Sequence, residues 1–385
     1  MNERTKNFLR EKFKEYYLEY PIQLPPEFES REWGFVMFDA LPKIVMYRHK
    51  SFLSRKEVLE YLRSMAPAHA FSSVAYYEHP GAGTMADKKW LGAELIFDLD
   101  ADHLRDAPKS YPAMLANVKN ETLKLLDFLT DDFGFSEDLI DVVFSGGRGY
   151  HIHVRDHRVR TLGSAERREI VDYVSGAGLT LKPVSISSSI SEIPKEVMGG
   201  WARKINRWIV GYLRDLKDPE TAVNKLQELD GIGAVKARGL VDGGLLDSVS
   251  DANIERIRKG EIKFLTGVQK SFWNRMILKA MQEIGASVDE PVTGDIKRLI
   301  RLPTSLHGGS SMRVVPLTLQ TIEMFDPLND AVVFSDVDIS VAAESQASCD
   351  LRGNHFEIEE GVNTVPEYAG IYLMCRGAVE YVKKL

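Results

Sequence analysis

The sequence has few cysteines and no long apolar run, and both absences narrow the kind of protein that it encodes. Its 385 residues include two cysteines, Cys349 and Cys375. These are too few for a disulfide framework and lack the C-x-x-C spacing of a zinc site. No uninterrupted apolar stretch reaches the roughly 18 residues that a membrane span requires. The first twenty residues are dense in charge, unlike a signal peptide. We therefore expect a cytoplasmic protein with no membrane partner.

The sequence also lacks the excess of positive charge that many nucleic-acid-binding proteins have. It contains 49 lysines and arginines against 56 aspartates and glutamates, a formal net charge of −7. This balance weighs against a uniformly basic binder. An enzyme that acts on nucleotides, however, needs only a local basic funnel on an otherwise acidic surface. The charge therefore lowers the expectation of a nucleic-acid function without excluding it.

The length of 385 residues suggests two or three units, and the hydrophobic periodicity predicts an α/β core interrupted by a helical insertion. Helical spacing covers 5–20, 55–65 and 114–131, and strand-like segments cover 33–38, 43–49, 72–79, 92–100, 139–145 and 149–156. A mostly helical stretch follows at 163–285, then strand-like segments at 310–318 and 331–334 and a terminal helix at 366–384. We predict a discontinuous core (1–162 and 286–385) that is interrupted by a helical insertion subdomain (163–285).

Two aspartates follow a buried strand in the segment AELIFDLDAD. Leu95, Ile96 and Phe97 predict the strand, and Asp98 and Asp100 lie at its end. Residues two apart on a strand point to the same face, about 6–7 Å apart at their Cα atoms. Carboxylates this close repel each other unless a cation lies between them, and hard oxygen ligands suit Mg²⁺ or Mn²⁺. The alternative is that the aspartates cap the strand or the following helix.

A glycine-rich turn joins two further strands in the segment VVFSGGRGYHIHV. Glycines let backbone N–H groups approach an anion. Arg148 can fork onto phosphate oxygens, and His151 can hydrogen-bond the same group. The turn therefore indicates a phosphate site, with an ordinary hairpin as the alternative. His151 and His153 share a strand face and suggest zinc as a further alternative, but no third ligand of suitable spacing is nearby.

A third segment, VDEPVTGDIKRLIRLPTSLHGGSSMRV at 288–314, combines acidic and basic groups. Asp289 can supply a third metal ligand if its strand lies beside that of the first two aspartates. Lys297, Arg298 and Arg301 form a basic cluster, although a solvated helix face is the better explanation of Arg298 and Arg301 when they are taken alone. A weaker signal, LDGIGAVKA at 229–237, is similar to the hairpin of helix-hairpin-helix DNA-binding modules, but it is also typical of an ordinary connection between helices. The basic residues at 203–217 are expected mainly in solvent, with a template contact as the alternative.

In this order, the three segments resemble the archaeo-eukaryotic primase small-subunit family. FDLDAD resembles its paired-aspartate strand, SGGRGYHIHV its SG-x-x-G-x-H turn, and the 288–314 segment its third-aspartate stretch with the R-L-P-x-S-L-H-G signature. Further likeness lies in REWGF at 31–35, RHKSF at 48–52 and CRGAVEYV near the end. The resemblance spans nearly the whole chain. It implies an α+β fold, with a primase-type catalytic core of mixed or antiparallel sheets flanked by helices.

The resemblance also implies roles for eight residues. Three match the family's catalytic, metal-binding carboxylates: Asp98, Asp100 and Asp289. Five are expected to hold the incoming triphosphate: Ser145, Arg148, His151, His307 and Arg31. The implied enzyme is a nucleotidyltransferase that uses Mg²⁺ or Mn²⁺ to make short primers from nucleoside triphosphates on a single-stranded DNA template. The implied partner is a primase large subunit, in a heterodimer.

The sequence departs from the family pattern at two places. No cysteine follows the paired aspartates, where relatives often carry a zinc knuckle, so we expect no zinc. Gly309 stands where many relatives have a lysine after the signature histidine. We expect another cation, Lys297, Arg298 or Arg313, to make the missing phosphate contact.

Two other classes of function compete with this interpretation. A metal-dependent nuclease or phosphatase can use the same three carboxylates, but it has less need for the basic turn and for His307. A non-catalytic DNA-binding module would use the turn at 229–237, but it leaves the carboxylates in apolar segments unexplained. The sequence therefore favours the primase.

Overall fold

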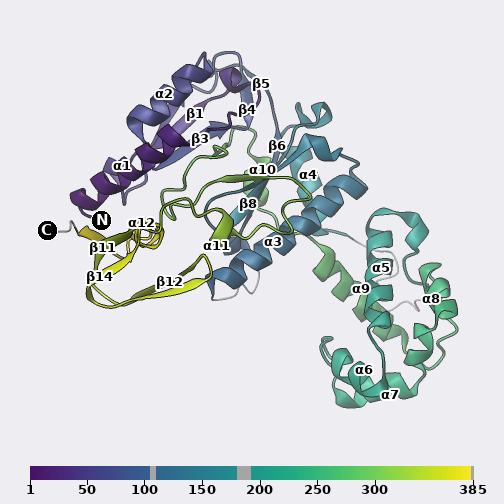
Figure 1. Ribbon diagram of the computed structural model, residues 1–385. Helices are drawn as coiled ribbons and strands as arrows, with labels where there is room; N and C mark the ends of the chain where they lie inside the picture. Colours follow the sequence, from purple (N-terminus) through teal and green to yellow (C-terminus); the bar gives the residue numbers. More distant parts are fainter. Residues whose placement is uncertain (105–109, 180–191, 383–385) are drawn as a thin grey trace. The chain divides into compact units, whose positions relative to one another are not determined.

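We describe the protein from a computed structural model over residues 1–104, 110–179 and 192–382. The chain divides into two compact units. Unit 1 comprises Met1–Leu123, Phe135–Val171 and Ser287–Leu385, and unit 2 comprises Lys124–Gly134 and Asp172–Ala286. Figure 1 follows the chain from unit 1 into unit 2 and back again. The predicted domain limits, with 163–285 as an insertion, stay a prediction because compactness alone does not show that unit 2 folds independently.

Unit 1 begins with helices and a four-stranded sheet. Helix α1 (Glu3–Glu19) starts where the Asn2 side chain accepts a hydrogen bond from the Thr5 N–H at 2.9 Å, an N-cap. Helix α2 (Arg55–Met65) packs against α1. The sheet has the order β2 (Met46–Lys50), β1 (Trp33–Val36), β3 (His69–Ser73) and β9 (Leu299–Arg301). Strand β9 therefore brings residues near 300 beside the N-terminal part of the chain.

A second four-stranded sheet lies at the centre of unit 1. Its order is β10 (Val315–Leu317), β7 (Ile140–Phe144), β8 (Gly149–Val154) and β6 (Leu95–Asp100). All six residues of β8 are buried, as its central position requires. Strands β4 (Ala75–Tyr77) and β5 (Trp90–Ala93) form a separate pair. Unit 1 also contains α10 (Glu290–Gly294), which contacts β6. Two longer helices begin in unit 1 and end in unit 2: α3 (Tyr111–Asp127) and α4 (Ser164–Ser175).

The C-terminal part of unit 1 holds two small sheets. One has the order β14 (Gly361–Pro366), β11 (Asp338–Ala343) and β15 (Glu380–Val382), and the other is the hairpin β12 (Ala347–Leu351) and β13 (Asn354–Ile358). Helices α11 (Pro327–Asp330) and α12 (Glu367–Cys375) complete this part. Every strand pairing in the described residues is antiparallel. The architecture confirms the α+β prediction.

The predicted terminal helix at 366–384 is wrong in its second half. Helix α12 ends at Cys375, because Gly377 adopts a left-handed φ of 74° and stops it. The N–H of Gly377 then donates to the Met374 carbonyl and the N–H of Ala378 to the Leu373 carbonyl, the two bonds of a Schellman motif. The chain then continues into β15. Gly377, which the sequence analysis placed inside the helix, therefore ends it.

The predicted strand at 331–334 is also wrong. The Arg352 side chain donates hydrogen bonds to the carbonyls of Val332 and Phe334, at 3.1 and 3.2 Å. These carbonyls are thus satisfied by a guanidinium instead of a neighbouring strand. The strands of this region, β11 to β14, lie further along the chain.

The described part of unit 2 is mostly helical, as predicted. Its helices are α5 (Gly200–Arg214), α6 (Pro219–Leu226), α7 (Ala234–Asp242), α8 (Asp251–Arg258) and α9 (Lys270–Ile284). Helix α5 buries Ile205, Ile209 and Leu213 on one face, the stripe that its 3.6-residue period predicts. Among the described residues of both units, no helix is long and apolar enough to cross a bilayer.

Candidate active site

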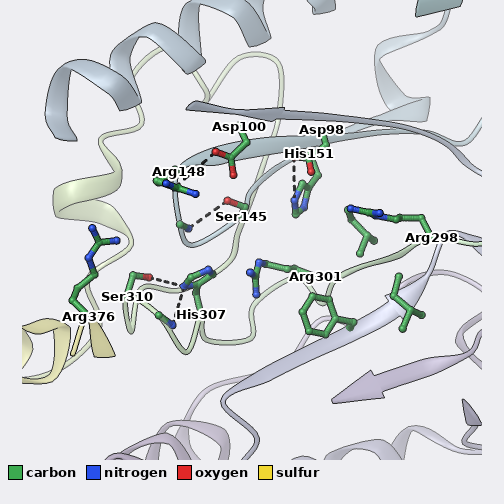
Figure 2. Close-up of a pocket in the computed structure, with 15 residues that line it drawn as sticks. Asp98, Asp100, Ser145, Arg148, His151, Arg298, Arg301, His307, Ser310 and Arg376 are labelled. Carbon is green, nitrogen blue, oxygen red and sulfur yellow. Dashed lines mark hydrogen bonds and ion pairs between the residues drawn. The ribbon is translucent and has the colours of Figure 1, made fainter. Parts of the chain in front are cut away.

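The paired aspartates lie at one edge of the central sheet, above a cavity. Strands β6 and β8 pair so that Asp98 is opposite His151 and Asp100 is opposite Gly149. Asp98 and Asp100 project from the same face of β6, and both line a cavity of about 470 Å³. Figure 2 shows the two carboxylates at one side of this cavity with arginine and histidine side chains around the rest. The sequence thus predicted the shared face correctly.

The glycine-rich turn between β7 and β8 forms the neighbouring wall of the cavity. Gly146 adopts a left-handed φ of 75°, a conformation that favours glycine. A Cβ atom on Gly149 would lie 2.0 Å from the Leu99 carbonyl oxygen, because β6 and β8 approach closely here. The Ser145 hydroxyl oxygen accepts from the N–H groups of Gly147 and Gly149, both at 3.3 Å. The hydroxyl is therefore oriented by the turn and can donate its own proton into the cavity.

Arg148 lines the cavity and already has an anionic partner. Its guanidinium donates to both carboxylate oxygens of Asp102, one at 2.7 Å, and its Nε lies 3.8 Å from Oδ1 of Asp100. The side chain is 38% exposed. Tyr111 donates a 2.6 Å hydrogen bond from its hydroxyl to the Gly147 carbonyl and so ties the turn to α3. The guanidinium has the planar fork that suits a phosphate.

Two buried histidines face the same cavity in their neutral form. Burial lowers the pKa of His151 well below its usual value, helped by His153, Arg301 and Arg298. Its Nε2 lies 3.7 Å from Oδ1 of Asp98. Burial likewise lowers the pKa of His307 well below its usual value, helped by Arg301 and His69.

The tautomer of His307 follows from its hydrogen bonds. The Gly309 N–H donates to Nδ1 of His307 at 3.2 Å, so Nδ1 carries no proton and the neutral ring is protonated at Nε2. A Cβ atom on Gly147 would lie 3.1 Å from that Nε2, which places the N–H beside the glycine-rich turn. His307 is therefore a neutral donor rather than a cation.

Asp289 is brought next to Asp98 through the backbone. It is the N-cap residue of α10, and its N–H donates to the Asp98 carbonyl at 3.0 Å. Asp289 is not one of the residues that line the cavity. In the described ranges no three Asp, Glu, His or Cys side chains are gathered closely enough to form a metal site. The structure therefore joins the two stretches of chain, while the three carboxylates are not clustered.

Arg31 does not line this cavity, and its expected contact with the triphosphate stays a prediction. The side chain is 1% exposed and does not line the cavity. It forms an ion pair with Glu94, stacks at 4.4 Å on the Tyr76 ring and donates to the Ser73 carbonyl at 2.7 Å. Burial opposes the charge on Glu94, but Arg31, His153 and Arg155 hold the pKa of this carboxyl well below its usual range. The direction of the Arg31 side chain therefore follows from its ion pair with the buried carboxylate of Glu94.

The contacts of Glu94 also concern the alternative of a zinc site at His151 and His153. Nδ1 of His153 lies 2.7 Å from Oε2 of Glu94, whereas His151 lines the cavity. The two histidines thus have different neighbours, a buried carboxylate for His153 and the cavity for His151. Residues 105–109, within the segment in which relatives often carry a zinc knuckle, lie outside the described residues.

Three arginines line the cavity in addition to Arg148: Arg298, Arg301 and Arg376. Of the three cations expected to compensate for Gly309, Arg298 lines the cavity, whereas Lys297 and Arg313 do not. Arg301 lies on β9, so the helix-face alternative for it is wrong. Its guanidinium lies 2.7 Å from Nδ1 of His69, and burial lowers its pKa to about 10 against the opposing effect of Asp98 and Asp100.

These arginines are hard to find from spacing. Arg298 precedes β9 and Arg301 ends it. A 2-residue period places residues three apart on opposite faces of a strand, and a 3.6-residue period places them together on a helix that does not form here. Arg376 is the C-cap of α12, far along the chain from the end of the third motif at residue 314. The one signal for it is the likeness of CRGAVEYV to the family.

The weaker sequence signals lie in unit 2. The turn at 229–237 joins α6 to α7, as an ordinary connection does. In α5, Lys204 pairs with Asp127 and Arg207 with Glu196. The basic residues of α5 are thus partly neutralised by neighbouring carboxylates.

Comparison with known proteins identifies the family of the chain. Residues 97–319 match the family model described as DNA primase small subunit. The DNA primase small subunit PriS of Methanococcoides burtonii is 49% identical over 99% of this chain and 100% of that protein. Those of Methanosphaerula palustris and Methanosarcina acetivorans are 47% and 44% identical, over 99% of this chain and 99% and 98% of those proteins. The chain therefore belongs to the DNA primase small-subunit family, as the three motifs and their order predict.

Proposed function

We propose that this chain is the catalytic subunit of a DNA primase and synthesises short primers from nucleoside triphosphates on single-stranded DNA. Membership of the primase small-subunit family supports this class of reaction. One observation at the site carries the proposal further. A carboxylate pair and the glycine-rich turn that carries Arg148 line the same cavity, and a backbone hydrogen bond ties Asp289 to Asp98.

The donors at the cavity fit a hard divalent cation. Asp98 and Asp100 offer carboxylate oxygens from one strand face, and oxygen donors are those that Mg²⁺ and Mn²⁺ prefer. We propose that Asp98, Asp100 and Asp289 together hold such cations. Bound there, the cations would supply polarisation of the attacking 3′-hydroxyl and screening of the charge on the leaving pyrophosphate.

The protein's own side chains bind and orient the nucleotide. Arg148 grips phosphate oxygens with its fork, and the Ser145 hydroxyl and the N–H groups of His151 and His307 donate to them. The reaction forms a bond between the 3′-oxygen and the α-phosphorus and breaks the bond from that phosphorus to pyrophosphate. No covalent intermediate with the protein is needed. Catalysis is therefore largely positioning and electrostatic stabilisation.

The proposal includes two macromolecular partners. The template contributes a phosphate backbone, so its binding is expected to weaken as salt concentration rises and to depend little on sequence. The printed names of the relatives contain the words small subunit, which supports a heterodimer with a primase large subunit.

The proposal is tested by substituting Asp98. The purified protein is incubated with single-stranded template, labelled nucleoside triphosphates and either Mg²⁺ or Mn²⁺, and the products are separated by length. The wild type is expected to make new strands, and Asp98→Asn to lose at least about 100-fold in rate, a loss typical of removing one transition-state stabiliser. Asp338→Asn, an exposed aspartate on β11, is the matched control.

The fold of both variants is checked by thermal unfolding, and Asp98→Asn is expected to be at least as stable as the wild type because a like-charge repulsion is relieved. Undiminished primer synthesis by Asp98→Asn would sink the proposal. So would shortening of the template without synthesis, since that is the behaviour of a nuclease.

A further inference from the structure

Arg376 is one of three arginines of the cavity, with Arg298 and Arg301, that the proposed mechanism does not yet use. It lines the cavity with Arg148 and His307. In Figure 2 it lies on the side of Ser310 and His307, whereas Arg298 lies on the opposite side. Gly309, which also lines the cavity, contributes no side chain. Arg376 therefore brings a full positive charge to a wall that otherwise offers neutral donors.

The guanidinium of Arg376 is held in place without a carboxylate partner. Its central carbon lies 5.7 Å from the ring centroid of Tyr111 and 6.0 Å from that of Tyr372, within reach of a cation–π contact. In the described part of the chain it takes part in no ion pair. By contrast, Arg148 pairs with Asp102. Arg376 thus keeps its charge available to an anion in the cavity.

Hydrogen bonds also hold the backbone that carries Arg376. The residue caps the C-terminus of α12, and the Schellman bonds at Gly377 and Ala378 hold the chain immediately after it. The Tyr111 ring beside it is anchored by the hydroxyl hydrogen bond to the Gly147 carbonyl. Arg376 and the turn that carries Arg148 are therefore linked through one tyrosine.

From this geometry we propose that Arg376 binds the terminal phosphate of the incoming nucleotide and makes the cavity select nucleoside triphosphates over diphosphates. The inference rests on the proposed function, in which the α-phosphate lies at Asp98 and Asp100. The phosphate chain then runs from these carboxylates past Ser145 and His307, and its last phosphate reaches the wall of Arg376. A diphosphate ends before that wall.

Nucleotide binding measured without template tests the proposal. ATP and ADP are titrated calorimetrically, with Mg²⁺, into the wild type, Arg376→Ala and Arg376→Lys. Arg376→Ala is expected to weaken ATP binding by about tenfold or more, since hydrogen bonds to charged groups are among the stronger ones, and to leave ADP binding unchanged. Arg376→Lys keeps the charge but not the planar fork, so its affinity for ATP should lie between those of the wild type and Arg376→Ala. Arg10→Ala, an exposed arginine of α1 paired with Asp39, is the control.

An ATP-to-ADP affinity ratio that Arg376→Ala leaves unchanged would overturn the inference, as would a wild type that binds the two nucleotides equally. Weaker binding of single-stranded DNA with unchanged ATP binding would instead make Arg376 a template contact and also overturn it. These outcomes are separable from the primer assay. A protein that makes no primers can still show the selectivity, and one that makes primers can lack it.

Discussion

At the scale of single residues, the ion pair between Arg148 and Asp102 is expected to compete with the proposed binding of nucleotide by Arg148. Asp102 holds the guanidinium through both of its oxygens, and both side chains are partly exposed, at 38% and 56%. A phosphate that needs the same fork must displace or share this partner. Asp102 thus keeps Arg148 oriented while weakening its attraction for the ligand.

Asp102→Asn is therefore expected to lower the apparent KM for nucleotide by a few fold, because an exposed ion pair of this kind is worth about 0–1 kcal/mol. The measurement is steady-state primer synthesis at varied nucleotide concentration. Glu27→Gln, which alters the exposed two-contact pair of Glu27 with Arg160, is the matched control and should leave KM unchanged. A higher KM in Asp102→Asn would mean that Asp102 orients Arg148 more than it competes for it.

Arg31 shows why a residue's role does not follow from a motif alone. REWGF at 31–35 resembles the family, and an arginine there is a plausible phosphate ligand. The sequence does not reveal that Glu94, far along the chain, is fully buried and needs compensating cations. Burial of one carboxylate therefore decides the position of an arginine 63 residues away.

At the scale of elements, the close approach of β6 and the β7–β8 hairpin builds the site. Asp100 pairs with Gly149 in this antiparallel ladder. The absence of a side chain at Gly149 lets the Leu99 carbonyl come within 2.0 Å of where its Cβ would be. A side chain there would push β6, with both aspartates, away from the glycine-rich turn between β7 and β8.

Gly149→Ala is expected to destabilise the protein by about 1–3 kcal/mol or more, since the clash is with backbone and cannot be relieved by a rotamer change. It should also lower primer synthesis. Urea unfolding followed by circular dichroism measures the first effect. Gly239→Ala is the control, because α7 has open space at that glycine and the change should stabilise the helix by about 1 kcal/mol. Equal stability of Gly149→Ala and the wild type would show that β6 and β8 are not so tightly apposed.

The elements that carry the chemistry were those that the sequence predicts well. Strands β6, β7 and β8 are short apolar runs bounded by charge or glycine, a local pattern. Strand β9 and the C-terminal sheets were missed or misplaced, because their pairing partners lie far along the chain. Strand β9, for example, pairs with β3, more than 200 residues earlier. A local period carries no information about such pairings.

At the scale of the whole molecule, the fold joins stretches that the sequence keeps apart. Every residue lining the cavity belongs to unit 1, although unit 2 interrupts that unit between residues 171 and 287. The order of the three motifs predicted that they act together, and the bond between Asp289 and Asp98 supports this. The motifs did not predict how the carboxylate of Asp289 lies, because a side chain's direction depends on its packed surroundings.

The central claim is that Asp98, Asp100 and Asp289 share bound cations next to the phosphate pocket. The most direct measurement is anomalous X-ray diffraction from crystals grown with Mn²⁺ and a nucleoside triphosphate. The account predicts manganese within coordination distance of all three carboxylates, with the triphosphate extending toward Arg148 and His307. Manganese bound elsewhere, or bound at Asp98 and Asp100 with the Asp289 carboxylate out of reach, would contradict it.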